Sequence, residues 1–206
     1  MRIPRTALCL PIALLLAACA STTIRSAWFD TSYQGGPLKK IVVVGVGAQA
    51  VDRRVFEDAF AQRLRAAGVD ALPGYTVVSD EARQSEAAFN TAIEGSGADG
   101  VLIVQLLGVD THTQITTTMV PSSNLGWGWG RGWGSGFGPT WVPVQQVSQY
   151  DVARVETNLY EARTRRLIWA ASTDTLNPAS VARETPRFAD LIIRELRARG
   201  LIAGVG

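Results

Sequence analysis

Four consecutive β-branched apolar residues, Ile41-Val42-Val43-Val44, are the feature that most limits what this chain can fold into. A run without polar alternation is typical of a strand that is buried on both faces, as in a parallel sheet. The next segment begins with Asp52, a good N-cap residue, and ends at Gly68. Its apolar residues recur with helical spacing: Val55, Phe56, Ala59, Phe60 and Leu64. A buried strand followed by such a helix predicts the first unit of an α/β fold.

The same alternation continues to about Leu107. Residues 75–78 predict a second strand, and a shorter helix is expected between Ser85, as its N-cap, and Gly95. Residues 101–107, which are mostly apolar, predict a third strand. Strands and helices of this length in alternation indicate right-handed, parallel βαβ units.

The pattern changes after Leu107. The threonine-rich residues 109–119 predict a long, half-exposed strand at which the sheet turns antiparallel. Residues 155–159 alternate between apolar and polar, and residues 167–170 complete a hairpin. A last helix is expected with Thr185 as N-cap, Pro186 at its first position and Gly200 just past its end. The predicted fold class is therefore α/β, with a mixed sheet in two or three layers: βαβαβ, then an antiparallel ββ hairpin and a C-terminal helix.

The amino-terminal residues have the composition of a secretory signal. Arg2 and Arg5 precede a short apolar stretch, and the small residues Ala17 and Ala18 precede Cys19. A helix needs about 20 apolar residues to cross a bilayer, and this stretch is shorter. We therefore expect a signal peptide over residues 1–18, outside the folded domain.

The sequence Leu16-Ala17-Ala18-Cys19 resembles the lipobox of bacterial lipoproteins. The resemblance implies cleavage before Cys19, a diacylglyceryl thioether on its sulfur and an acyl group, such as palmitate, on its amine. Two or three acyl chains anchor a protein stably, whereas one does so marginally. Ala20 is not the aspartate of the inner-membrane retention signal, so the resemblance further implies the outer membrane, facing the periplasm. Cys9 leaves with the signal, so we expect no disulfide.

The remaining chain has the length of one domain. We expect a lipidated tether over residues 19–38 and a single α/β domain over residues 39–202, with a Gly/Trp-rich hairpin insertion at about 121–143. The whole chain has a formal charge of +2, and Arg2 and Arg5 account for it. Such a balance indicates no nucleic-acid partner and no polybasic membrane patch.

Every second residue between Gly126 and Gly138 is glycine. In an extended chain this period places the intervening side chains on one face. The candidate contact surface consists of Trp127, Trp129, Trp133, Phe137 and the nearby Trp141. It could pack on a glycan, a membrane interface or an envelope protein. The alternative is a low-complexity loop without a binding role.

Two further patterns carry weak signals. Residues 45–50 match Gly-x-Gly-x-x-Ala, but Asp80 lies too far along the chain for the acidic residue of a dinucleotide site. Asp110 and His112 would share a strand face, and His112 is the chain's single histidine. A catalytic zinc site normally uses three protein ligands. We therefore expect no cofactor, no metal site and no catalytic residue.

The predicted element order over residues 39–200 resembles the α/β domains of penicillin-binding-protein activator lipoproteins, the curli secretion lipoprotein and the amino-terminal Tol domain. The segment from Leu159 to Trp169, with its Leu-Ile-Trp strand, resembles a hairpin of uncharacterised bacterial lipoprotein domains. These resemblances imply a non-enzymatic outer-membrane accessory, assembly or binding module. Two alternatives stay open. One is a periplasmic hydrolase with a cleft near Asp110 and His112, and the other is an oligomeric secretion or assembly component.

Overall fold

The computed structural model describes residues 22–122 and 140–203. Cys19, Trp127, Trp129, Trp133 and Phe137 lie outside these ranges. A mixed six-stranded sheet has the order β1-β6-β5-β4-β2-β3, with β2 parallel to both β3 and β4 and the other pairs antiparallel. The strands are β1 (Thr22–Phe29), β2 (Lys40–Val46), β3 (Asp70–Pro73), β4 (Gly100–Ser122), β5 (Thr140–Glu161) and β6 (Arg166–Leu176). The α/β fold class with a mixed sheet is confirmed.

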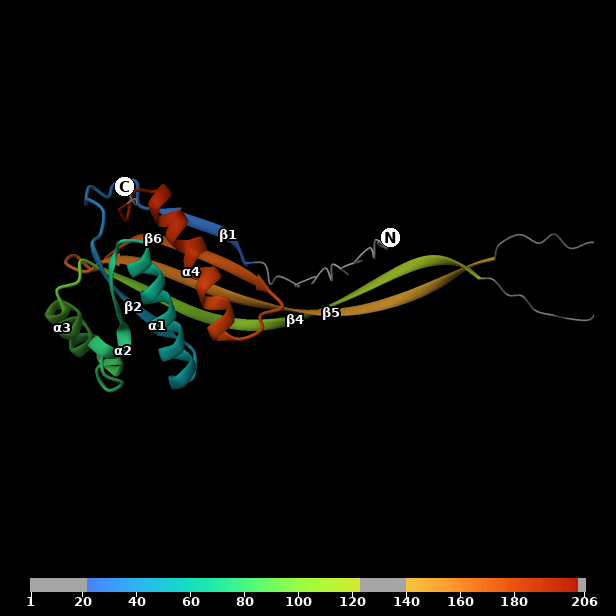
Figure 1. Ribbon diagram of the computed structural model, residues 1–206, viewed down its shortest axis with the longest axis horizontal. Helices are drawn as coiled ribbons and strands as arrows, with labels where there is room; N and C mark the ends of the chain where they lie inside the picture. The colour runs from blue at the N-terminus through green and yellow to red at the C-terminus, as the bar shows by residue number, and fades with distance from the viewer. Residues whose placement is uncertain (1–21, 123–139, 204–206) are drawn as a thin grey trace, which may run out of the picture.

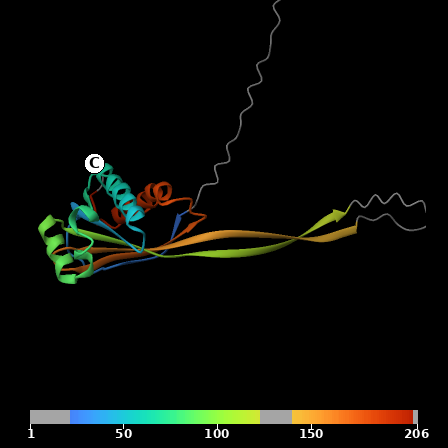
Figure 2. The same ribbon diagram turned by 90° about the horizontal axis from the view of Figure 1, so that it is seen from below.

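The helices cover the two faces of the sheet unequally. They are α1 (Ala50–Ala66), α2 (Gly74–Val77), the 3-10 turn η1 (Ala82–Gln84), α3 (Glu86–Ser96) and α4 (Val181–Ala198). Helices α1 and α4 lie on one face, where Phe60 and Ile192 pack with Ile41 in the larger core (Figure 2). Helix α3 contributes Ile93 to a smaller core with Val42. The buried run 41–44 thus faces apolar neighbours on both sides, as predicted. No helix in the described ranges is long and apolar enough to cross a membrane.

Several predicted boundaries are wrong. Residues 22–29, expected within a tether, form β1, an edge strand paired with β6. The second parallel strand is β3, and residues 75–77, expected in a strand, belong to the short helix α2. Helix α1 has Gln49 as N-cap and places Asp52 in its first turn. Helix α4 begins at Val181, so Pro186 lies inside it rather than at its first position.

Strands β4 and β5 extend far beyond the rest of the sheet (Figures 1 and 2). They are 23 and 22 residues long and pair antiparallel from Gly100↔Glu161 to Ser122↔Thr140. Strand β2 accompanies β4 only as far as Gln105, and β6 accompanies β5 only from Val152. The predicted antiparallel, threonine-rich strand is therefore confirmed, and its outer half belongs to a two-stranded ribbon.

Candidate functional site

We call residues 111–122 of β4 and 140–151 of β5 the outer ribbon. At about 3.3 Å per residue it extends for roughly 35 Å. Its side chains are exposed on both faces between Thr111 and Met119 and between Val142 and Gln149. Ile115 and Val147 lie opposite each other in the register and are 63% and 61% exposed. The ribbon thus places apolar side chains in water with no covering layer in the described structure.

Charged side chains are nearly absent from this part of the sequence. From Thr111 to Tyr150 the only Asp, Glu, Lys or Arg is Arg131, whereas charged residues make up 18% of the whole chain. A hydrogen bond and an aromatic stack join the two strands at the base of the ribbon. The Thr111 hydroxyl donates to Asp151 Oδ1 at 2.7 Å, and the His112 ring stacks on Tyr150 with centroids 5.3 Å apart. This depletion of charge was the sequence signal for an unusual hairpin.

The two outer edges of the ribbon have no partner strand in the described structure. Isolated two-stranded ribbons are marginally stable in water. Unpaired edges also offer rows of N–H and C=O groups to another chain. Soluble proteins usually protect such edges with lysine, proline or bulges. The described ribbon has no lysine, and its two prolines, Pro121 and Pro143, lie near its outer end. The arrangement favours pairing with further strands.

Asp110 and His112, the residues of the hydrolase alternative, lie at the base of this ribbon. Asp110 is 56% exposed and forms an ion pair with Arg154 at 3.7 Å. His112 is exposed and stacks on Tyr150. Neither side chain lines the apolar pocket described next. The described ranges contain no group of three His, Cys, Asp or Glu residues that could bind a metal ion, so neither side chain belongs to such a group. The geometry gives no support to a catalytic pair.

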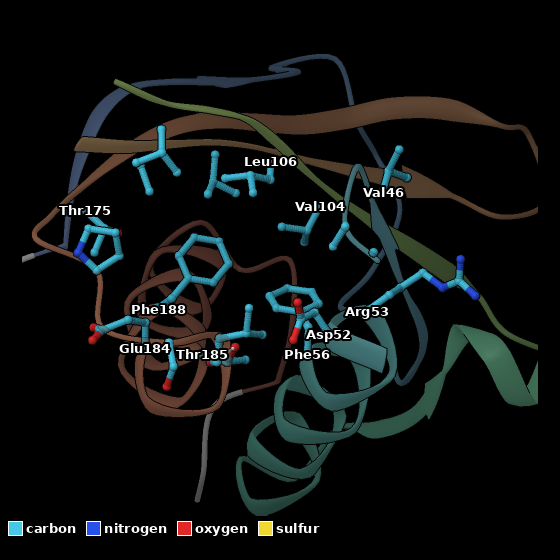
Figure 3. A pocket seen from close by; sticks show the side chains of 18 of the residues that line it. Val46, Asp52, Arg53, Phe56, Val104, Leu106, Thr175, Glu184, Thr185 and Phe188 are labelled. Atoms are coloured by element: carbon cyan, nitrogen blue, oxygen red, sulfur yellow. Dashed lines mark hydrogen bonds between the residues drawn. The ribbon is translucent and has the colours of Figure 1, made fainter. Parts of the chain in front are cut away.

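An apolar pocket of about 280 Å³ lies between the sheet and the amino-terminal turns of α1 and α4 (Figure 3). Phe56 of α1 and Phe188 of α4 form one wall, with ring centroids 6.2 Å apart. Apolar residues of β4 and β5 form the opposite wall: Val104, Leu106, Val109, Ala153 and Val155. The sequence did not indicate this pocket, because its residues belong to six elements that only the fold brings together.

The polar groups of the pocket lie at the helix ends. Asp52 and Glu184 are the acidic residues of the first turns of α1 and α4. The Ala179 amide donates to Glu184 Oε1 at 3.3 Å, while Glu184 Oε2 is buried without a hydrogen-bond partner in the structure. Arg53 pairs with Asp80 at 2.5 Å. The two carboxylates occupy the positions at which helix dipoles would otherwise attract an anion.

The Gly-x-Gly-x-x-Ala segment beside the pocket is structural. The Gly45 amide donates to Glu57 Oε1 at 2.9 Å, so it is not free to bind a phosphate. Gly47 has φ +84, and a Cβ there would lie 2.9 Å from the Leu106 carbonyl oxygen. Glycine is therefore required at this turn for steric reasons. Gly45, in contrast, is a residue of strand β2 and pairs with Val104.

Glu57 is a charged residue that the sequence did not single out. Its side chain is fully buried, and it forms an ion pair with Arg83 at 3.0 Å. Its other oxygen accepts the Tyr75 amide at 2.7 Å. The Tyr75 hydroxyl donates to Asp58, and this hydrogen bond to a carboxylate raises the pKa of the phenol. Because these contacts join α1 to the ends of β2 and β3, Glu57 holds the pocket's α1 wall in place.

No protein-family profile and no curated protein matches the chain. Among solved structures it is similar to the PelC dodecamer from Paraburkholderia phytofirmans, with 14% identity over 89% of this chain and 99% of that one and a TM-score of 0.44. It is also similar to lipoprotein GNA1162 from Neisseria meningitidis, with 14% identity over 77% and 98% of the two chains and a TM-score of 0.41. Function is therefore inferred from this chain's own residues.

Proposed function

We propose that this chain is a non-enzymatic lipoprotein of the bacterial envelope, anchored through Cys19 in the outer membrane and facing the periplasm. Its role is assembly, with the outer ribbon pairing edge to edge with ribbons of further copies. The observation that carries this proposal is the ribbon itself: it is long, has Asp151 at its base as its only charged residue, is largely exposed on both faces, and is unpaired at both edges in the described structure.

Self-pairing would stabilise the ribbon, whose two edges are otherwise unpaired. Each added strand would supply partners for the free N–H and C=O groups of an edge, and sheets of three or more strands are more stable than a single hairpin. Copies of the same chain also meet without like-charge repulsion, since the described ribbon between Thr113 and Gln149 contains no Asp, Glu, Lys or Arg. A charged ribbon would instead favour solvation as a monomer.

The amino-terminal end of β1 and the base of the ribbon lie at one end of the domain. Thr22, the first described residue, pairs with Thr175, which pairs with Ala153, which pairs with Val109 at the ribbon's base. This row crosses the sheet from the first described residue of β1 to the start of the ribbon. A lipid on Cys19 would therefore keep the base of the ribbon close to the membrane surface, and neighbouring copies would be held in one plane.

The test is the mass of the purified, lipidated protein in mild detergent by analytical ultracentrifugation. We expect an oligomer for the native chain and a monomer for Val147→Lys, because a lysine on an exposed strand blocks edge pairing. Val51→Lys is the matched control: it introduces the same charge at an exposed valine, 74% accessible, on α1. It should leave the oligomer intact.

A native monomer would overturn self-assembly. If in-cell crosslinking then captured a different envelope protein or a glycan on the ribbon, the function would be binding rather than assembly. Labelled palmitate and membrane fractionation test the anchor separately. The Cys19→Ala chain should lose the label, and the native protein should fractionate with the outer membrane. Failure of either result contradicts the proposed localisation without bearing on the ribbon.

A further inference from the structure

The apolar pocket opens onto the same row of residues that begins at Thr22. Val109, Ala153 and Thr175 all line the pocket, and they are consecutive partners across β4, β5 and β6. Thr22 continues the row on β1, with its Oγ1 3.0 Å from Thr175 Oγ1. The hydroxyl contact places the Thr22 side chain on the pocket's face of the sheet. The amino-terminal end of β1 therefore lies beside the pocket.

Cys19 lies three residues before Thr22. An extended chain spans at most about 3.6 Å per residue, so the Cys19 backbone is within roughly 11 Å of the first residue of β1. A long acyl chain on the sulfur-linked glycerol or on the amine can cover at least a comparable distance. The spacing thus lets the anchor's acyl chains reach the pocket when the short connecting segment runs toward it.

The pocket has the chemistry of a site for a neutral, aliphatic ligand. Its walls are formed by the rings of Phe56 and Phe188 and by aliphatic side chains of the sheet. A free fatty acid would bring a carboxylate toward Asp52 and Glu184, and those two residues already complement the helix amino termini. An acyl chain held by an ester of the glycerol or by the amide on the amine brings no charge, and it avoids this repulsion.

We infer that the pocket binds one acyl chain of the lipid anchor on Cys19 of the same molecule. The inference rests on the lipidation in the proposed function but not on self-assembly. The anchor's remaining chains stay in the membrane. Holding one chain in the pocket fixes the domain against the bilayer with the base of the ribbon beside it, because Val109 belongs to both the pocket wall and the strand that becomes the ribbon.

The experiment uses cells that express the full native chain and are fed a palmitate analogue with a diazirine in its acyl chain. After irradiation, mass spectrometry locates the residues crosslinked to the lipidated amino-terminal peptide. We expect crosslinks within the same molecule to peptides of α1 or α4 that contain Phe56 or Phe188. Two variants alter the pocket: Val109→Asp introduces a charge, and Val155→Trp fills space with an apolar ring.

Each variant should reduce these crosslinks about tenfold, because an unpaired charge or a filled cavity excludes the chain. The matched control for Val109→Asp is Ile115→Asp. Both residues are exposed, at 51% and 63%, and they share one face of β4, but Ile115 lies outside the pocket. Ile115→Asp should keep the crosslink and lose self-association. Thermal unfolding of each variant checks that the domain is folded.

Crosslinks to phospholipid alone, or pocket crosslinks that persist in both pocket variants, would overturn the inference. Crosslinks from probe-labelled phospholipid, with none from the Cys19 lipopeptide, would assign the pocket to a membrane lipid and would also overturn it. If the probe did not enter the protein at all, the proposed lipidation would fail as well, and this result is visible before irradiation. A native chain that is monomeric but keeps its pocket crosslinks would overturn self-assembly only.

Discussion

Glu57 joins three segments of the chain through one buried carboxylate. It accepts the backbone amides of Gly45 and Tyr75 and pairs with Arg83. Removing one partner of a buried pair leaves the other charge uncompensated in a region of low dielectric. We expect Glu57→Gln to lower the free energy of unfolding by about 3 kcal/mol, measured by urea denaturation.

The matched control is Glu94→Gln. Glu94 also pairs with an arginine, Arg165, at 3.0 Å, but both side chains are more than half exposed. Surface ion pairs contribute about 0–1 kcal/mol, so this substitution should have little effect. Equal losses for the two variants would show that the burial of Glu57 does not strengthen its contacts.

For single residues, the sequence predicted those roles that depend only on neighbouring residues in the chain. The Ser85 cap is confirmed, since its Oγ accepts the Ala88 amide at 3.4 Å, and Gly200 follows α4 with φ +70. The role of Glu57 could not be predicted, because it depends on Arg83 and Tyr75, which approach only in the folded chain. Aspartate is a suitable N-cap residue, but the N-cap of α1 is Gln49, three residues before Asp52.

Strand β1 is an element that was not predicted from the sequence. Its residues were expected in a tether, because no local apolar run marks them as a strand. Its pairing partner, β6, lies more than a hundred residues further along the chain. Phe29 packs against the larger core, whereas the neighbouring Trp28 is 51% exposed. This difference follows from the alternation of side chains along a strand.

The β1 assignment predicts opposite outcomes for two adjacent aromatic residues. Phe29→Ala should lower the free energy of unfolding by about 2 kcal/mol, because Phe29 is partly buried and leaves a cavity. Trp28→Ala removes a larger ring that is mostly in water, so it should cost less than about 1 kcal/mol. Chemical denaturation of both variants is the measurement. Negligible losses for both would mean that residues 22–29 act as the tether expected from sequence.

The segment after β3 shows why the ends of an element were harder to predict than whether it is a helix or a strand. Residues 75–78 contain threonine and valines, which favour strands, yet the parallel partner of β2 ends at Pro73. At Gly74 a Cβ would lie 2.7 Å from the Val43 carbonyl oxygen, so the chain passes very close to β2 before it turns into α2. This close approach, not the local propensity, determines where β3 ends.

For the molecule as a whole, the core and the outer ribbon are separate. The buried apolar residues of the described structure include Val104 and Val152, but none of those between them. Folding stability therefore arises in the sheet and helices, while the ribbon extends from them as an appendage (Figure 1). A threonine-rich strand was predictable from its residues. Its extension past every neighbouring strand was not, because that depends on where β2 and β6 end.

This separation predicts that the ribbon can be removed without unfolding the domain. Thr111 and Asp151 face each other in the register, so an Asn-Gly turn joining them would replace residues 112–150 with a short hairpin. Because the shortened chain keeps every buried core residue, its unfolding temperature should stay within a few degrees of the native value. It should also be monomeric in detergent, since it lacks the exposed edges that assembly would use. A large fall in unfolding temperature would instead show that the ribbon stabilises the domain, and oligomers that survive the deletion would place the assembly surface elsewhere on the molecule.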